Sequence, residues 1–184
     1  MAKSGPERSG AAPDAVGGRV PPHDLAAEKA VLSALLIDNA AFDEVCAEIK
    51  AEDFYHPAHQ IVYKTMVAIH DDEKPVDLIT LSSDLNAQKR LDAIGGTVYL
   101  AEISDFEATA ANVVHHAQIV RDKAVKRHLI RVASEIVEVG YEESEAAERL
   151  LDVAESKIFD ISKEKSRTRF TSLHDEMPGT FDYV

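Results

Sequence analysis

A single helical pattern runs unbroken through residues 112–139. Apolar side chains recur three and four positions apart, which places them on one face of one long helix. At 1.5 Å per residue, these 28 residues would span roughly 42 Å. That length exceeds what the core of a small domain needs, so we expect part of the helix to project or to meet another chain. The apolar positions are Val113, Ala117, Val120, Ala124, Leu129, Val132, Ile136 and Val139.

A second helical pattern follows in residues 144–162. We expect Gly140 to end the first helix in a left-handed conformation, and Ser144 to cap the second helix. A connection this short makes two helices antiparallel neighbours. The sequence therefore predicts a long helical hairpin. The second helix carries its apolar groups at Ala147, Leu150, Leu151, Ala154, Ile158 and Ile161.

The two hairpin helices carry opposite charge. Residues 121–131 hold five basic side chains against Asp122, and residues 142–155 hold six acidic side chains against Arg149. We interpret the basic stripe as a solvated face that pairs with the acidic helix, although exposed pairs contribute little to stability. Binding of nucleic-acid phosphates is the alternative. It is less favoured because no aromatic side chains interleave with the basic ones as a stacking platform requires.

Shorter helical patterns fill the chain before the hairpin. Asp24 and Asp77 are placed to cap helices, and Pro57 suits the first position of another helix. The Gly95-Gly96 pair breaks the chain before a last short helix. The segment around Val76 has strand character but no partner strand, so we predict an all-α fold. A small multi-helix globule is followed by the long antiparallel helical hairpin.

Four segments follow from these patterns. Residues 1–22 are rich in glycine and proline and are expected to form a flexible tail. Residues 23–108 form the helical globular subdomain, and residues 109–162 form the hairpin. Residues 163–184 begin with a basic run and are expected to be a linker.

The sequence contains no pattern that predicts catalysis. It has neither a phosphate-binding loop nor a dinucleotide-binding glycine motif. His56 and His59 lie near Asp53, but a metal site needs more convergent ligands, so capping and surface roles are favoured. We interpret Cys46 as a small buried thiol on the apolar face of a helix. No catalytic, cofactor-binding or metal-binding residue is therefore assigned.

The amino-acid composition limits which functional classes remain. A formal net charge of −13 disfavours nucleic-acid binding through the overall field of the chain. The single cysteine excludes an internal disulfide and suits a reducing compartment, so we expect a cytoplasmic protein. No run approaches the ~20 apolar residues of a membrane span.

An ordered set of short motifs resembles the N-terminal domain of the bacterial replicative helicase, the DnaB family. The set begins with Arg19-Val20-Pro21-Pro22-His23, and Asp53-Phe54-Tyr55 with His59 follows at compatible spacing. The likeness extends from about Arg19 to Met177. Its further members are Glu28, Val31, Leu32, residues 76–81, Ile94-Gly95-Gly96, Tyr99-Leu100, Ala111-Asn112, residues 117–121, Leu150, Glu155 and Ile158-Phe159.

This resemblance implies a collar domain with no motor of its own. In the family, a six-helix globule carries a hairpin, hairpins pair between subunits, and the hexameric collar is a trimer of dimers that recruits the helicase-binding domain of primase. A helicase loader is a further possible partner. ATP and Mg²⁺ belong to a RecA-like motor domain that follows the linker and is not among these 184 residues. DNA would be bound mainly by that motor, so unwinding is not expected of this segment alone.

The resemblance also leads to residue-level expectations. We expect primase to contact Tyr99, Ile130 and Ile136. For the contact between subunits we expect Val113, Ala117, Val120, Ala124 and Ile158. The alternative function is an independent helical scaffold that binds nucleic acid through the basic clusters at residues 121–131 and 163–169.

Overall fold

Helices account for the whole regular structure of the described residues. The computed structural model describes residues 19–106, 110–141 and 146–171, and side chains only as far as Lys163. No strand occurs in these ranges, so the all-α prediction is confirmed there. The helices are α1 (Leu25–Ile37), α2 (Phe42–Glu48), α3 (Pro57–Asp71), α4 (Leu78–Ala87), α5 (Gly96–Ser104), α6 (Val113–Gly140) and α7 (Ala147–Thr171), with short 3₁₀ turns η2 (Asn39–Ala41), η3 (Ala51–Asp53), η4 (Asp92–Ile94) and η5 (Ala110–Asn112).

The globule's helices begin where the sequence places caps. The Asp24 carboxylate accepts a hydrogen bond from the Ala27 amide at 3.0 Å. The Asp77 carboxylate accepts from the amides of Ile79 and Thr80, both at 2.8 Å. These bonds satisfy amides that have no partner inside the helix. Both predicted caps are confirmed, and Pro57 does occupy the first turn of α3.

The globule and the first half of α6 share one core. Phe42, Val62 and Met66 are fully buried, together with the inner faces of α1, α4 and α5. Val113, Ala117 and Val120 of α6 belong to the same apolar cluster. Accordingly α6 packs against α1, α2 and η3. The boundary expected near residue 108 therefore separates two segments of sequence but not two cores.

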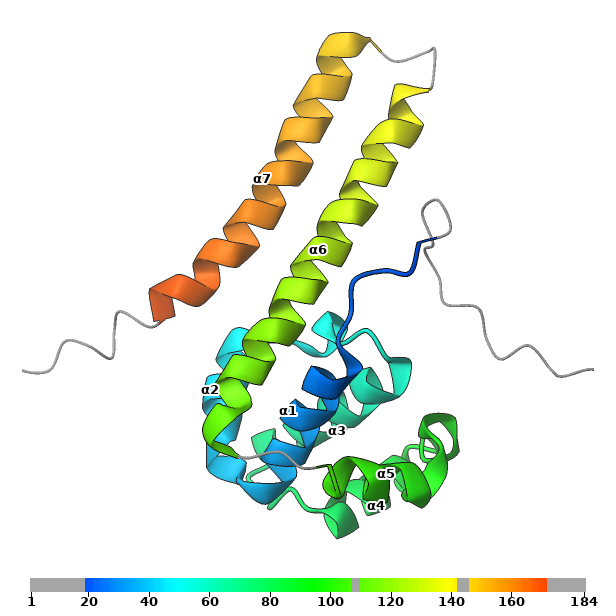
Figure 1. The fold of residues 1–184 in the computed structure, drawn as a ribbon, viewed down its shortest axis with the longest axis vertical. Helices are drawn as coiled ribbons and strands as arrows, with labels where there is room; N and C mark the ends of the chain where they lie inside the picture. Colours follow the sequence, from blue (N-terminus) through cyan, green and yellow to red (C-terminus); the bar gives the residue numbers. More distant parts are fainter. Residues whose placement is uncertain (1–18, 107–109, 142–145, 172–184) are drawn as a thin grey trace, which may run out of the picture.

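The second half of α6 leaves the globule and pairs with α7. Figure 1 shows the two helices side by side, with the lower end of α7 returning toward α2. After Ala124, the one buried residue of α6 is Val132. Glu135 of α6 forms an ion pair with Lys157 of α7. The predicted antiparallel hairpin is present in the described residues.

The ends of the hairpin helices differ from expectation. Gly140 is the last residue of α6 but has no left-handed conformation, and Tyr141 follows it with φ −85° and ψ −8°. The Tyr141 amide bonds back to Val137 and Glu138, so the right-handed geometry continues past the glycine. The predicted cap at Ser144 lies outside the described residues. At its other end α7 continues to Thr171, nine residues past the expected end at Ser162, because residues 147–171 contain no glycine or proline.

Gly95 is a glycine that the fold requires. Its φ of +100° lies in the left-handed region, where other residues are strained. An added Cβ there would also lie 3.2 Å from the Tyr99 Cβ, tighter than a normal contact. The predicted chain break before α5 is therefore confirmed, and it directs Tyr99 toward α3.

Candidate protein-interaction surface

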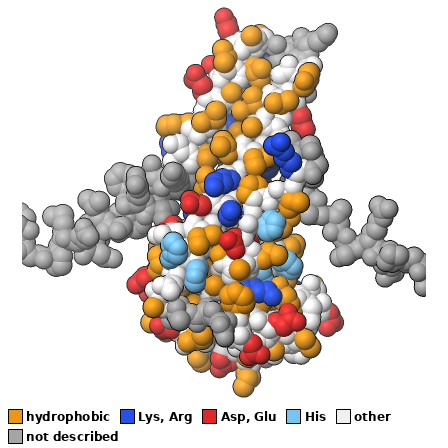
Figure 2. Space-filling model, viewed as in Figure 1, with side chains coloured by type: hydrophobic (Ala, Val, Ile, Leu, Met, Phe, Trp, Pro, Cys, Tyr) orange, Lys and Arg blue, Asp and Glu red, His pale blue; other side chains and the backbone are white. Residues whose placement is uncertain are grey.

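Exposed apolar side chains gather on the hairpin. In the described part of the chain, twelve large apolar residues are exposed. Seven of them belong to the hairpin, four to the larger globule segment and one, Val20, to the segment before it. Figure 2 shows apolar side chains across the upper part of the molecule, where α6 and α7 lie. A concentration of this kind is typical of protein-binding surfaces. The seven are Leu129, Ile130, Val137, Tyr141, Leu151, Ile158 and Phe159.

Both hairpin helices contribute to one apolar side. The Glu135–Lys157 ion pair marks the opposite side of the hairpin. Ile136 is the next residue after Glu135, and Ile158 is the next residue after Lys157. Each isoleucine therefore points about 100° around its helix axis from the member of the ion pair that precedes it. Because the helices are antiparallel, the two rotations turn toward the same side. Leu129 and Leu151, each seven positions from one of these isoleucines, lie there too. We call Leu129, Ile136, Leu151 and Ile158 the hairpin apolar face.

A separate stripe lies on the side of α6 away from α7. Ile130, Val137 and Tyr141 recur at i, i+7 and i+11, so they share one helix face. They are 40%, 56% and 85% exposed. Ile136, which is half-buried, lies on a different face of α6 from Ile130. Two of the three residues expected to contact primase are therefore on the same helix but not on the same face.

Tyr99, the third of those residues, lies in the globule. It belongs to α5, at the end of the molecule opposite the hairpin tip (Figure 1). Its hydroxyl lies 2.8 Å from Nε2 of His59, and the Lys29 ammonium lies 5.3 Å from its ring centroid. Within one chain, the structure does not bring Tyr99 together with Ile130 and Ile136.

Most residues expected at the contact between subunits have another role. Val113, Ala117 and Val120 are at most 3% exposed inside the chain's own core, and Ala124 is 8% exposed. These four side chains are thus covered by α1, α2 and η3 before any partner binds. Ile158 differs, because it is 52% exposed on the hairpin apolar face. The spacing of apolar residues identifies a buried helix face but does not say which chain buries it.

Sequence reasoning missed a buried polar network around Glu28. The carboxylate, 1% exposed, accepts hydrogen bonds from the amides of Tyr55 (2.6 Å) and His56 (3.2 Å). It also lies 2.6 Å from Nδ1 of His59, which is fully buried and contacts Tyr99 through its other nitrogen. The network joins α1, α3 and α5. Glu28 lies on the apolar stripe of the first helix. Its position there could have predicted the network from the sequence, because a buried carboxylate needs polar partners.

The histidines of this region have structural roles. The His56 ring accepts a hydrogen bond from the Ala58 amide, so the expected capping role is confirmed. Desolvation by burial lowers the pKa of His56, and the adjacent His59 lowers it further. His59 is buried rather than at the surface. The described residues contain no cluster of three or more acidic, histidine or cysteine side chains that could hold a metal ion.

A second missed set lies at the base of the hairpin. Arg121 donates to both oxygens of the Asp53 carboxylate, at 3.0 and 3.2 Å. Arg127 donates to the backbone carbonyls of Asp53 and Pro22. These two arginines of the basic stripe therefore contact the globule rather than pairing only with α7, which corrects the expectation of a solvated face. Burial lowers the pKa of Arg127, with Glu28 and Asp53 acting in the opposite direction.

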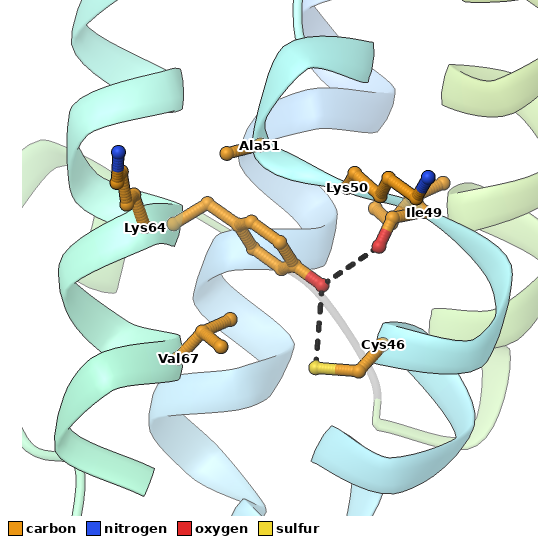
Figure 3. Close-up of a pocket in the computed structure, with 7 residues that line it drawn as sticks. Cys46, Ile49, Lys50, Ala51, Lys64 and Val67 are labelled. Carbon is orange, nitrogen blue, oxygen red and sulfur yellow. Dashed lines mark hydrogen bonds between the residues drawn. The ribbon is translucent and has the colours of Figure 1, made fainter. Parts of the chain in front are cut away.

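A shallow pocket of about 220 Å³ lies between α2, η3 and α3 (Figure 3). Tyr63 lines it, and the Tyr63 hydroxyl lies 3.5 Å from the Cys46 sulfur and donates to the Ile49 carbonyl at 3.2 Å. Cys46 lines the pocket and is exposed, so the expectation of a buried thiol was wrong. Partial burial still raises the pKa of the thiol.

No described helix combines the length and apolar composition needed to cross a bilayer. The candidate interaction surface lies on the hairpin. It consists of two apolar sides of a projecting hairpin, held at its base by arginines.

Comparisons with known proteins agree with this architecture. The profile of the DnaB-like helicase N terminal domain family matches residues 20–122. The replicative DNA helicase DnaB of Geobacillus stearothermophilus is 40% identical over 166 residues, covering 90% of this chain and 37% of the relative. The replicative DNA helicase DnaC of Bacillus subtilis is 34% identical over 171 residues, covering 93% of this chain and 38% of the relative. This chain therefore spans little more than a third of the length of these relatives.

Solved structures share the fold. The crystal structure of the N-terminal domain of DnaB helicase from Mycobacterium tuberculosis aligns with a TM-score of 0.72 at 35% identity, covering 77% of this chain and 99% of that one. A DnaB-like replicative helicase, described together with its interactions with primase, aligns with a TM-score of 0.63 at 22% identity, covering 85% of this chain and 36% of that one. From the family match over more than half of its length, this chain belongs to the DnaB-like helicase N-terminal domain family.

Proposed function

We propose that this chain is the collar domain of a replicative DNA helicase. In this role it pairs subunits within an oligomer and recruits primase during DNA replication. Membership of the family and the similarity to replicative helicases support the proposal. The observation that carries it is the hairpin apolar face, because four apolar side chains from two helices are aligned on one side of a projecting element.

Self-pairing is the first part of the proposal. Leu151 and Ile158 are 63% and 52% exposed and lie two turns apart on α7. Burying such a face against the same face of a second copy would give a twofold-symmetric contact, the commonest arrangement of homo-oligomers. A dimer of hairpins and a hexamer built from such dimers are both compatible with this contact. Ile158 remains the subunit-contact residue that we propose.

Recruitment of primase is the second part. The similar DnaB-like helicase described with its primase interactions supports it. We propose Ile130 and Ile136 as hairpin contacts and Tyr99 as a globule contact. Since Tyr99 lies far from the other two within one chain, the proposed primase site combines the hairpin of one subunit with the globule of another.

Strand separation would belong to another part of the helicase. We propose that ATP and Mg²⁺ bind only a motor domain outside these 184 residues. DNA would be bound mainly by that motor, and a helicase loader would be a further partner. We infer a cytoplasmic location from the proposed role in replication.

The self-pairing proposal is tested by mass in solution. We expect the wild-type chain to sediment as a dimer or larger at micromolar concentration. The Leu151→Glu, Ile158→Glu double variant should sediment as a monomer, because a buried unpaired carboxylate opposes assembly. Val98→Glu with Ile79→Glu is the matched control, since it adds the same charges to exposed apolar positions of the globule. A double hairpin variant that assembles as tightly as this control would contradict the proposal.

The primase proposal needs a separate titration. We expect the helicase-binding domain of primase to bind the wild-type chain and to lose at least about tenfold in affinity with Ile130→Ala, Ile136→Ala, since interface anchors contribute more than about 1 kcal/mol each. The control is Ile37→Ala, Ile79→Ala, which shortens two exposed isoleucines elsewhere on the chain. Equal primase affinity of both double variants would remove Ile130 and Ile136 from the proposed site.

A further inference from the structure

The hairpin leaves the globule at a defined point on α6. Ala124 is the last α6 residue buried beside the core, and Val132 is the one buried position that follows. Residues 128–140 project beyond this point over roughly 20 Å. Any change of direction at the base is therefore amplified at the tip. A rotation of 20° there would move the tip by about 7 Å, more than the spacing between adjacent side chains on a helix face.

Two arginines of α6, one on either side of Ala124, form hydrogen bonds with the globule. Arg121 binds the Asp53 carboxylate, and Arg127 donates to the Asp53 carbonyl. The positions are six apart on α6 and flank the buried face that carries Ala124. Asp53 is 8% exposed and accepts a further hydrogen bond from the Lys50 amide, so η3 holds the carboxylate in place.

Arg127 also holds the segment that precedes α1. Its second guanidinium nitrogen donates to the Pro22 carbonyl at 2.8 Å. The guanidinium carbon lies 5.7 Å from the ring centroid of Tyr55, and His23 stacks on the same ring at 4.3 Å. One side chain thus ties together α6, η3 and residues 22–23. A planar guanidinium suits this task, because its several donors point in different directions within one plane.

We propose that Arg127 is a positioning residue that fixes the direction of the hairpin on the globule. By this means it aligns the hairpin apolar face for pairing. Arg127 need not touch a second subunit for this effect. The close approach of α7 to α2 provides a second connection between hairpin and globule, so loss of Arg127 should loosen the hairpin without freeing it. The expected effect of Arg127 on self-association rests on the proposed function. Its expected effect on the direction of the hairpin does not.

The direct test measures the hairpin direction. In a Cys46→Ser background, spin labels are placed at Ile79→Cys on α4 and Glu138→Cys near the hairpin tip, both exposed positions. Double electron–electron resonance at a concentration where the chain is monomeric then reports the distance between globule and tip. We expect one narrow distribution for the parent and a broader, shifted one for Arg127→Gln. Lys126→Gln is the matched control, because it removes the same charge from an exposed neighbour.

Self-association is the second readout. We expect Arg127→Gln to weaken it about tenfold, because a hairpin with no fixed direction must be ordered on binding, and Lys126→Gln to leave it unchanged. Equal distance distributions for these two folded variants would overturn the proposal. If Arg127→Gln no longer melts cooperatively, Arg127→Lys is measured instead, since it keeps the charge but not the planar fork. A parent that never assembles would contradict the proposed function but leave the distance result valid.

Discussion

Among single residues, Glu28 has the most demanding environment. Its carboxylate is nearly inaccessible and meets two backbone amides and the His59 ring. A buried acid is tolerated only when its oxygens are fully hydrogen-bonded. The network thereby fixes the turn before α3, where Tyr55 and His56 lie, against α1. Its contribution is to the fold of the globule.

Replacing Glu28 by glutamine should destabilise the chain. The amide keeps one acceptor, but its NH₂ group would face donors that now lack a partner. We expect the free energy of unfolding in urea to fall by about 1–3 kcal/mol. Glu44→Gln is the matched control, because Glu44 is exposed on α2, and it should change stability little. Equal stability of the two variants would mean that the network contributes nothing.

The hydroxyl group of Tyr99 can be tested separately from its ring. Tyr99→Phe removes the hydroxyl that contacts His59 but keeps the ring at the surface. We expect a loss of about 0.5–1.5 kcal/mol in the free energy of unfolding, because one buried partner is lost. Primase affinity should stay within twofold if the ring alone makes the proposed contact, and a titration of the variant against primase measures it. A larger loss of affinity in a stable variant would assign the contact to the hydroxyl.

Between elements, the hairpin pair α6 and α7 depends on charge as well as on apolar contacts. Lys157 donates a hydrogen bond to Glu135, which together with the lysine charge lowers the pKa of that carboxyl group. An acid with a lowered pKa in the folded state contributes stability above its unfolded pKa. That contribution is lost as the pH falls through the lower, folded pKa.

The pH dependence of the hairpin follows from this sign. We expect Glu135→Gln to melt at a lower temperature than the wild type at pH 7. The difference should shrink as the pH falls through the folded pKa of Glu135, which lies below the ordinary glutamate value of about 4.3. Added salt should also reduce the difference, since the pair is exposed. Thermal melts from pH 7 to pH 3 measure it, with Glu138→Gln, also on the exposed end of α6, as control. A difference that persists at pH 3 would show that the variant acts on packing.

For the whole molecule, charge distribution separates the two functions considered. The chain has a formal net charge of −13, and two of the basic residues on α6 are engaged with the globule. We therefore expect a short DNA duplex to bind more weakly than about 10⁻⁴ M at physiological salt. Fluorescence anisotropy of a labelled duplex, repeated at low salt, measures this. Tight binding that weakens steeply with salt would favour the nucleic-acid scaffold over the collar.

The sequence alone was sufficient for most features governed by local rules, although the left-handed helix end expected at Gly140 was wrong. Helical spacing, Asp24, Asp77 and Pro57 predicted most helices and their starts, and the length of the pattern predicted the projecting hairpin. The ordered motifs also indicated the family. Such features depend on residues within a few turns of each other, so they can be read along the chain.

Tertiary structure decided which partner each face meets. Val113 and Ala117 belong to the same helical pattern as Leu129, yet the first two are buried where α6 packs on α1 and α2, while Leu129 is 48% exposed. Glu28 meets His59, and Asp53 meets Arg121, across 31 and 68 positions of sequence. Spacing reports only that a helix has an apolar or charged face. What covers that face depends on packing between segments far apart in the chain, which no local pattern encodes.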